Sequence, residues 1–386
     1  MLSLTTNPFP RRASGLALSL ALLVNILAAC VTSGKTPIPQ VGDLTRLTFA
    51  CPTDDKMIYQ AATAAFHDAY PNLTVEIVPV ERSTPVDQLA SRADAFVCYE
   101  SCVESGPAGL LLDLTPFLQN QQSIQEPDFL SGLVERFRWQ GGLWGIPAGV
   151  DPLVVFYDRA AFDEAGVTYP TVDWTWDDLR NRARLLTRRE EEQIARYGFA
   201  DPLGCGVESV IEAWGVEIVD ASVEPPRPML DDPRAVTAVQ WYTDLALTHG
   251  VMLNPVQRTG QPPPLSLLQG EAAMVAGLAS WWPEAATSHP SVQVAPLPGK
   301  TPLMNVYGYF ISAGATHPEA TWCWLQFLSR KVTPPDLLPA RRSLIPQSVY
   351  AAADEGTLAV FQYAVEHALP PIRPVMARAW LSQALD

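Results

Sequence analysis

The chain has 386 residues, of which 48% are hydrophobic and 17% are charged, and its formal net charge at pH 7 is -15. This composition is typical of an ordinary globular protein, and the length favours two lobes or domains over a single core. The acidic balance argues against nucleic acids and anionic lipid headgroups as partners, because it repels phosphates.

The N-terminal segment has the features of an export signal. Arg11 and Arg12 precede an apolar run at 16–28, which is short for a membrane span, and small residues lead up to Cys30. A cysteine in this place resembles the lipobox of bacterial lipoproteins, in which the signal is removed and the cysteine carries a diacylglycerol. The alternative is an ordinary secretory signal that happens to contain a cysteine.

On the lipoprotein interpretation, residues 1–29 are the signal peptide, Cys30 is the lipidated first residue, and 30–43 is a flexible tether. No other stretch is long and apolar enough to span a bilayer. We therefore expect the folded body to lie outside the cell, anchored to the outer face of the bacterial cytoplasmic membrane by lipid only.

The first folded segment predicts a βαβ unit. Residues 44–51 are a strand candidate, apolar residues recur at helical spacing over 58–69, and 73–77 alternates as a second strand. The two strands should be parallel. Residues 93–99 predict a third, buried strand.

Residues 145–157 carry two extended runs, which we expect to be joined by a turn at 149–152. A helix follows from about Arg159 and ends at Gly166, because glycine favours the left-handed conformation at a helix C-terminus. The turn contains Asp151. A carboxylate flanked by apolar strands is expensive unless it has a use, so Asp151 is a candidate functional residue.

Further helices are predicted from capping patterns, and strands are expected at 272–276, 292–298 and 306–311. Trp322 lies at apolar spacing on the last capped helix and is interpreted as a core residue. Because strands and helices alternate throughout, the predicted fold class is α/β. The predicted capping residues are Thr53 or Asp54, Thr175 with Asp178, Asp232 with Pro233, and Thr316 with Pro318.

The cysteines after Cys30 permit a disulfide outside the cytoplasm. Cys51 and Cys98 end strands that should be neighbours, and Cys102 is close to Cys98 in the sequence, so we expect Cys98 to pair with Cys51 or with Cys102. Cys98 and Cys102 lack a second pair at zinc-finger spacing, so no metal site is predicted.

The sequence lacks the motifs of common catalytic and cofactor sites. It contains no G-x-S-x-G, no H-E-x-x-H and no glycine-rich phosphate loop. Adjacent carboxylates such as Asp177 and Asp178 are better explained by helix capping than by glycoside hydrolysis. We therefore predict no enzymatic activity and no cofactor.

Aromatic residues are the most abundant candidate ligand contacts, with eleven tryptophans and eleven tyrosines. Rings beside strand ends suit stacking on the apolar face of a sugar, while carboxylates and amides bind its hydroxyls. Each ring is equally compatible with a place in the core. The candidates are Trp144, Trp214, Trp281, Trp282, Tyr99 and Tyr307.

Several stretches together resemble the extracellular solute-binding proteins of family 1, the maltose-binding-protein-like sugar-binding group of ABC importers. The matching pieces lie in family order between Leu44 and Lys331 and include GGLWGIPAGVDPLVVFYDRAAFDEAG, DWTWDDLRNRARLLT and GEAAMVAGLASWW. Two features depart from the pattern: Tyr-Asp-Arg at 157–159 replaces Tyr-Asn-Lys, and the chain looks short after Trp380.

The resemblance implies a type II periplasmic-binding-protein-like fold. Two lobes, each a mostly parallel sheet flanked by helices, would enclose a ligand cleft and close on the ligand by a hinge motion. The implied first lobe is 44–149 with 301–332, and the second is 150–300 with 333–386.

The resemblance also implies a site. Asp151 lies where the chain first crosses between the lobes and would contact sugar hydroxyls; the alternative is that it only bonds backbone amides in the hinge. The other predicted ligand-binding residues are Trp281, Trp282, Tyr99, Glu100, Tyr307, Trp214 and Asp54.

The predicted function is therefore a monomeric, lipid-anchored binding component of an ABC importer. It would capture a carbohydrate, in particular an oligosaccharide, and deliver it to a membrane permease. Two alternatives stay open at this point: a cell-surface glycoside hydrolase, and a sensory sugar-binding protein that feeds a membrane receptor.

Overall fold

The computed structural model describes residues 44–119, 126–191, 193–220, 223, 226–253 and 270–371. The predicted signal peptide, Cys30 and the tether up to residue 43 lie outside the described residues.

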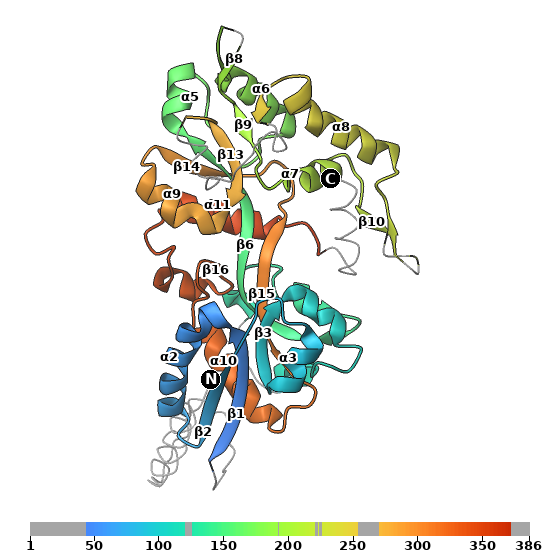
Figure 1. Cartoon of the computed structure of the whole chain (residues 1–386), viewed down its shortest axis with the longest axis vertical. Coiled ribbons are helices and arrows are strands. Elements are labelled where there is room, and N and C mark those ends of the chain that lie inside the picture. The colour runs from blue at the N-terminus through green and yellow to red at the C-terminus, as the bar shows by residue number, and fades with distance from the viewer. Residues whose placement is uncertain are drawn as a thin grey trace, which may run out of the picture. The chain divides into compact units, whose positions relative to one another are not determined.

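The first described elements form the predicted βαβ unit (Figure 1). Strand β1 (Thr45–Pro52) pairs in parallel with β2 (Leu73–Val80), and helix α2 (Lys56–Ala69) connects them. On its other side β1 pairs in parallel with β3 (Ala95–Tyr99), which follows α3 (Val86–Arg92). The predicted parallel arrangement is confirmed.

A single long strand, β6 (Gly145–Asp158), runs through the centre of the main sheet beside β15 (Leu303–Ile311), as Figure 1 shows. The turn expected at 149–152 is therefore wrong. Pro152 has no N–H to give to the sheet, and it lies in a gap on one side of β6, because the pairing with β16 ends at Val150 and the pairing with β13 begins at Leu153.

Within the described residues the main sheet contains ten strands, in the order β12-β9-β13-β6-β15-β3-β1-β2, with β14 and β16 also paired to β6. β9 pairs in parallel with both β12 and β13, whereas β13 and β14 run antiparallel to β6. The strands are β9 (Phe199–Ala200), β12 (Met252–Leu253), β13 (Met274–Leu278), β14 (Val292–Pro296) and β16 (Leu338–Pro339). The described part of the chain also has three two-stranded antiparallel pairs: β4 (Arg138–Trp139) with β5 (Gly142–Leu143), β7 (Arg188–Glu190) with β8 (Gln193–Arg196), and β10 (Val219–Asp220) with β11 (Arg227–Pro228).

Three helices confirm the boundaries expected from the sequence. Helix α5 (Arg159–Ala165) ends at Gly166, whose φ is 64°. Helix α6 (Trp176–Leu186) begins with a complete capping box between Thr175 and Asp178, and in α8 (Pro233–Leu247) Asp232 accepts a hydrogen bond from the Arg234 N–H. The remaining α-helices are α4 (Thr115–Gln119), α7 (Gly206–Ala213), α9 (Trp282–Ser288), α10 (Pro318–Lys331) and α11 (Glu355–Glu366).

Two expected caps are wrong. Helix α2 begins after Asp55, and no side chain caps it, because a 3-10 turn at Thr53–Asp55 leads directly into the helix. Helix α10 begins after His317, while the Thr316 hydroxyl bonds the carboxylate of Asp94. The 3-10 turns are η1 (Thr53–Asp55), η2 (Glu100–Ser105), η3 (Glu126–Asp128), η4 (Glu135–Phe137), η7 (Ala279–Trp281) and η8 (Arg342–Gln347).

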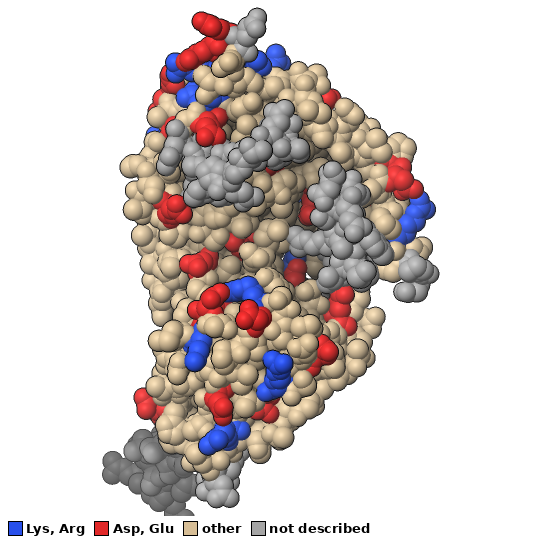
Figure 2. Space-filling model, viewed as in Figure 1, with Lys and Arg blue, Asp and Glu red and all other residues tan. Residues whose placement is uncertain are grey.

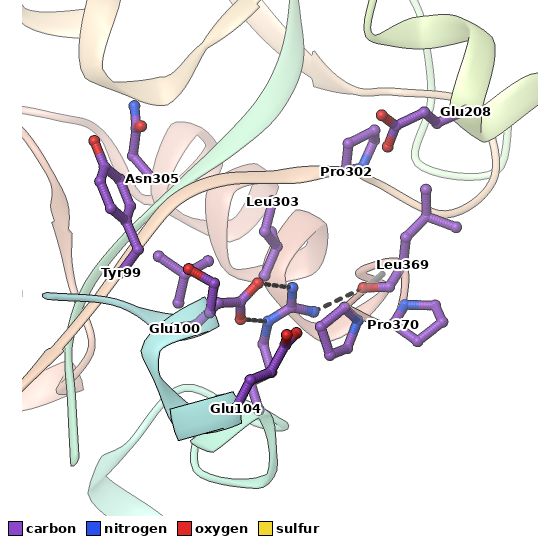
Figure 3. A pocket seen from close by; sticks show the side chains of 13 residues that line it. Tyr99, Glu100, Glu104, Glu208, Pro302, Leu303, Asn305, Leu369 and Pro370 are labelled. Carbon is purple, nitrogen blue, oxygen red and sulfur yellow. Dashed lines mark hydrogen bonds and ion pairs between the residues drawn. The ribbon is translucent and has the colours of Figure 1, made fainter. Parts of the chain in front are cut away.

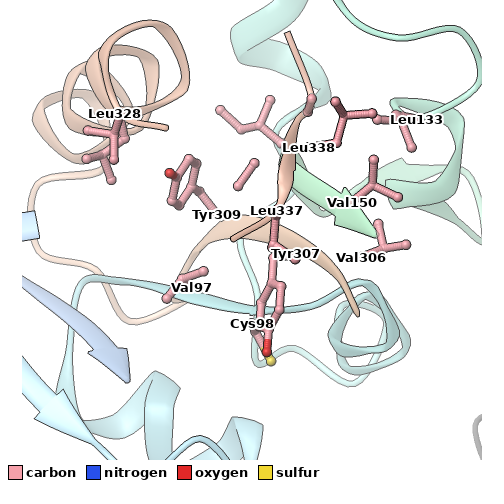
Figure 4. Close-up of a cluster of buried hydrophobic side chains, with 14 of the residues drawn as sticks. Val97, Cys98, Leu133, Val150, Val306, Tyr307, Tyr309, Leu328, Leu337 and Leu338 are labelled. Atoms are coloured by element: carbon pink, nitrogen blue, oxygen red, sulfur yellow. The ribbon is translucent and has the colours of Figure 1, made fainter. Parts of the chain in front are cut away.

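The buried apolar side chains form two clusters. One packs β1, β3 and β15 against α2 and α10 and includes Trp322, whose predicted place in the core is confirmed. Figure 4 shows part of this cluster, where Tyr309 of β15 lies between Val97 and Leu328. The other cluster packs α5, α6, α7 and α8 against β9 and β13. The α/β class is confirmed, whereas the exact boundaries of the two lobes stay a prediction.

The surface carries the acidic excess without a large basic patch on the face in Figure 2, where basic and acidic side chains are intermixed. Most of the arginines of α6 and its neighbourhood are paired with carboxylates, as in Arg180 with Asp177 and Arg182 with Asp178. No helix among the described residues combines the length and the apolarity that a membrane crossing requires.

Candidate functional site

Two adjacent cavities lie beside β3 and β15, and they share Tyr99 and Asn305; the larger one also contains residues of β6. We call the larger one, of about 270 Å³, the Asp151 cavity. The smaller one, of about 190 Å³, is the Glu100 cavity (Figure 3). The polar residues lining the Asp151 cavity are Asp55, Tyr59, Arg82, Tyr99, Asp151, Ser280, Asn305, Tyr307 and Asp336.

Asp151 is the most deeply buried carboxylate of the Asp151 cavity, with 1% of its surface exposed. It lies on β6, and its Oδ1 accepts a hydrogen bond from the Ser280 N–H at 2.9 Å. Its Oδ2 is buried and has no hydrogen-bond partner. Burial raises the pKa of Asp151 to about 6; Ser280 and Asn305 oppose the rise, and the charge of Asp336 adds to it.

Two residues of this cavity have left-handed backbone conformations. Asn305 in β15 has a φ of 47°, and Asp336, which precedes β16, has a φ of 60°. Asparagine and aspartate visit this region more readily than most residues, but the conformation still costs energy. Together with Asp151 on β6, they place one polar side chain on each of three neighbouring segments of the chain.

A pair of stacked tyrosines forms another wall. Tyr99 and Tyr307 face each other in the β3–β15 register, with ring centroids 4.4 Å apart and planes inclined by 30°. Arg82 donates a hydrogen bond to the Tyr307 hydroxyl at 3.1 Å and another to Asp55 Oδ1 at 3.3 Å. The aromatic wall is therefore held by an arginine whose charge is already matched by a carboxylate.

The Glu100 cavity is built around an ion pair. Arg136 Nε lies 2.5 Å from one oxygen of Glu100 and Nη2 lies 2.7 Å from the other, while Nη1 bonds the Leu369 carbonyl at 2.7 Å. Figure 3 shows these three contacts beside Glu104 of η2 and Glu208 of α7. This bidentate geometry fixes Glu100 on the cavity wall.

A disulfide closes the loop that joins the two cavities. Of the two predicted partners of Cys98, the structure pairs it with Cys102 and leaves Cys51 as a buried thiol. The closed loop contains Tyr99 and Glu100, which line the cavities. Burial raises the pKa of the Cys51 thiol to about 12, so that thiol is unreactive.

The structure brings three of the predicted ligand-binding residues, Asp151, Tyr99 and Tyr307, into the Asp151 cavity, and it places Glu100 in the neighbouring one. The other four are absent from both linings. Asp54 is exposed beside the cavity-lining Asp55.

The three tryptophans among the predicted ligand-binding residues pack against other aromatic rings. The ring centroids of Trp214 and Trp241 are 5.4 Å apart. Trp282 is 6% exposed and packs on Phe361. Trp281 is half-buried over Gly277 and directly follows Ser280, which lines the Asp151 cavity.

Sequence reasoning did not select Asp55, Arg82, Asn305 or Asp336. The signal for Asp55 was present, because it adjoins Asp54, but the rotation of the 3-10 turn decides which of the two faces inward. Asn305 and Asp336 depend on long-range pairing of the chain, which no local pattern reveals.

No cluster of three or more histidine, cysteine or carboxylate side chains with the geometry of a metal site occurs among the described residues. The described linings instead offer oxygen acceptors, hydroxyls and aromatic faces. Such a set suits a hydroxylated organic solute, which needs hydrogen bonds and a flat apolar surface.

The model of the bacterial extracellular solute-binding proteins matches residues 52–332. A characterised relative, the erythritol/L-threitol-binding protein of Mycolicibacterium smegmatis, is 28% identical over 221 residues. That match covers 49% of this chain and 45% of the relative, so less than half of the relative's length is compared.

Solved structures share the two-lobed fold. The sugar-binding protein MalE of Xanthomonas citri superimposes with a TM-score of 0.74 at 16% identity, over 88% of this chain and 90% of that one. An ABC substrate-binding protein of Listeria monocytogenes, solved in complex with cycloalternan, has a TM-score of 0.66 at 21% identity, over 86% and 89%. The predicted two-lobed α/β fold is thereby confirmed.

Proposed function

This chain belongs to the bacterial extracellular solute-binding proteins, and from that membership we propose that it captures a polyhydroxyl solute for an ABC importer. The solute is a sugar or sugar alcohol, with room for more than one ring because two cavities adjoin. The ligand lies in the Asp151 cavity and extends past Tyr99 toward Glu100.

One observation carries this proposal: Asp151 Oδ2 is buried, has no hydrogen-bond partner, and belongs to a side chain that lines a cavity. An unpaired buried carboxylate oxygen is costly, and a ligand hydroxyl would supply the missing donor. The stacked rings of Tyr99 and Tyr307 supply a face for the apolar side of a sugar.

The remaining parts of the proposal come from the N-terminal sequence and from the family. Cys30 is the lipid-bearing first residue of the mature protein, and the tether places the binding lobes outside the cytoplasmic membrane. The loaded protein, as a monomer, delivers its solute to a membrane permease. It binds the solute without converting it.

A thermal-shift screen with the purified protein tests this proposal. The panel contains sugar alcohols of four to six carbons, hexoses, maltose and longer maltodextrins, together with their aminated and carboxylated forms. A ligand at a hundred times its dissociation constant adds about 2.7 kcal/mol to the free energy of unfolding. The proposal predicts a saturable shift for at least one of these compounds, followed by 1:1 binding without turnover in calorimetry and chromatography.

Two results contradict it. If no member of the panel raises the melting temperature, the solute is not a polyhydroxyl compound of these classes. Repeated cleavage of a bound oligosaccharide would move the protein to the glycoside hydrolases.

A further inference from the structure

We propose that the solute carries a protonated amine: the Asp151 cavity selects an amino sugar or an amino-bearing polyol over its neutral counterpart and excludes the corresponding acid. This inference rests on the proposed function, because it concerns the same cavity, and it narrows the class of solute.

The first argument is the charge of the Asp151 cavity. Its lining contains three carboxylates, those of Asp55, Asp151 and Asp336, and one cationic side chain, Arg82. Arg82 does not neutralise the other two carboxylates, because its guanidinium donates hydrogen bonds to Asp55 and to the Tyr307 hydroxyl. Among the described residues neither Asp151 nor Asp336 forms an ion pair, so two negative charges of this lining are left without a matching protein cation.

The second argument is the balance of hydrogen-bond donors and acceptors. A neutral hydroxyl brings both a donor and acceptor lone pairs, whereas an ammonium group brings three donors and no acceptor. Asp151 Oδ2 is a buried acceptor without a hydrogen-bond partner, although the side chains of Ser280 and Asn305 lie close enough to lower the pKa of Asp151, and the one charged donor of the lining is already engaged. A donor-only group therefore complements this end of the cavity better than a hydroxyl does.

The third argument is the mutual placement of Asp151 and Asp336. They line the same cavity from different segments, and the charge of Asp336 makes ionisation of Asp151 more difficult. A cation between the two carboxylates relieves this repulsion, and its attraction to Asp151 is the stronger of the two because that carboxylate is buried. An anionic ligand would add to the repulsion.

The neighbouring Glu100 cavity is also lined by carboxylates, each of which already has a protein partner. Arg136 is matched by Glu100, and the lining also contains Glu104 and Glu208, which Figure 3 shows on opposite sides of the cavity. Tyr99, shared by both cavities, offers an aromatic face that attracts cations. A solute that passes from one cavity to the other meets carboxylates at both ends.

The test uses matched series of probes: glucosamine, glucose and glucuronate; the amino, neutral and carboxylate forms of a hexitol; and a disaccharide with its aminated form. Dissociation constants are measured by calorimetry at pH 7.5 in low and moderate salt. We expect the aminated member to bind at least about tenfold more tightly than the neutral one, as a charge-assisted hydrogen bond provides. The carboxylate member should not bind.

The variant Asp336→Asn tests which group makes the selection. Asp336 is exposed, and its backbone has a left-handed conformation. Asparagine tolerates this backbone conformation, so the variant should keep the fold. We expect this variant to weaken binding of the aminated probe more than binding of the neutral one, so that the ratio of their dissociation constants becomes smaller. Asp68→Asn, which removes an exposed carboxylate outside both linings, is the matched control and should leave this ratio unchanged.

The outcomes separate the two proposals. If neutral probes bind as tightly as aminated ones, or if Asp336→Asn and Asp68→Asn behave alike, the cationic solute is wrong and the polyhydroxyl-binding function stands. If neither these series nor any member of the thermal-shift panel binds, the proposed function itself falls.

Discussion

Asp151 on strand β6 is tied to Ser280 of η7, whose backbone N–H donates a 2.9 Å hydrogen bond to the Oδ1 atom of the carboxylate. The bond occupies one oxygen and leaves the other, Oδ2, without a partner in the cavity. The side chain thus links β6 to η7 and still presents one acceptor oxygen without a hydrogen bond. This arrangement is expected of a residue that binds a ligand.

Asp151→Asn should separate binding from stability. Asparagine keeps an Oδ1 acceptor for Ser280 and replaces the bare charged oxygen by an amide. Because ionised Asp151 is costly to bury, its removal should raise the free energy of unfolding of the apo protein at pH 7 by on the order of 1–3 kcal/mol. Ligand affinity should fall by about ten- to a hundred-fold.

Calorimetry and urea melts on the same preparations measure the two quantities. A variant that loses stability and keeps full affinity per folded molecule would show that Asp151 is only a hinge residue.

Ligand affinity should depend on pH through Asp151. Its pKa in the apo protein is raised to about 6, with burial as the main cause and Asp336 and Tyr350 among the groups nearby. A ligand donor requires the ionised carboxylate, so affinity should be constant well above pH 6 and fall by about tenfold per pH unit below it. Asp151→Asn should abolish this slope, and a slope that survives in the variant would assign it to another group.

Apo stability should have the opposite trend in this range. The folded state holds the Asp151 proton more tightly than the unfolded state does. Protonation of Asp151 therefore stabilises the fold, and this stabilisation is fully present below the pKa of the unfolded state, about 3.9. It is lost as pH rises toward 6. The difference in unfolding free energy between the wild type and Asp151→Asn, followed from pH 4 to 7, measures it.

The disulfide between Cys98 and Cys102 should hold the ligand-facing loop in place. Closing so short a loop stabilises the fold by about 2 kcal/mol or less. Its larger effect should be on binding, because Tyr99 and Glu100 lie inside the loop. We expect the double variant Cys98→Ser/Cys102→Ser to bind several-fold more weakly and to become insensitive to reductant.

Cys205→Ser, which removes a half-buried thiol that forms no disulfide and lies outside the linings, is the control and should keep both the affinity and the reductant effect of the wild type. Equal affinity of the double variant and the wild type would show that the loop needs no covalent support.

How far the sequence predicts the fold depends on how local each signal is. The capping box at Thr175 and the glycine at 166 were predictable, because the decisive interactions lie within a few residues. The turn predicted at 149–152 does not form, because pairing of β6 with β15, some 150 residues away, keeps the backbone extended through Pro152. Tertiary pairing outweighed the local proline signal.

The site could be predicted where the family motif and the strand order indicated the same residue, as for Asp151. It was harder to predict where the direction of a side chain decides whether the residue lines the cavity. Asp54 and Asp55 are equivalent in a sequence, and the geometry of η1 alone turns Asp55 toward the cavity. Asn305 and Asp336 could not be selected, because the left-handed backbone of Asn305 arises where the β6–β15 register is interrupted and that of Asp336 arises in the segment just before β16.

The adjacent tryptophans should differ in what they support. Trp282 is buried against Phe361, so Trp282→Ala should cost about 3–5 kcal/mol of stability. Trp281 is half-buried over Gly277 beside the cavity-lining Ser280, and Trp281→Ala should cost less stability and weaken binding. Gly277→Ala, whose Cβ would lie 2.4 Å from Trp281 Cε3, should displace the ring and give the same binding defect.

Melts and titrations of the three variants distinguish these roles. If Trp281→Ala and Gly277→Ala leave the ligand affinity unchanged, Trp281 supports the core and has no effect on binding.

Cys30→Ala should release the protein from the membrane. The substitution removes the thiol that would carry the diacylglycerol, so we expect unprocessed precursor or soluble protein in place of a membrane-associated mature form. Cell fractionation with mass spectrometry of the N-terminus measures this. Unchanged cleavage and unchanged membrane association would rule out lipidation at Cys30.

The most direct test of the account is a crystal structure of the protein with a solute that gives a saturable thermal shift. The account predicts density for the solute in the Asp151 cavity, a ligand donor within hydrogen-bond distance of Asp151 Oδ2, and a ring or carbon face against Tyr99 or Tyr307. A solute bound elsewhere, with Asp151 Oδ2 still unpaired, would contradict it.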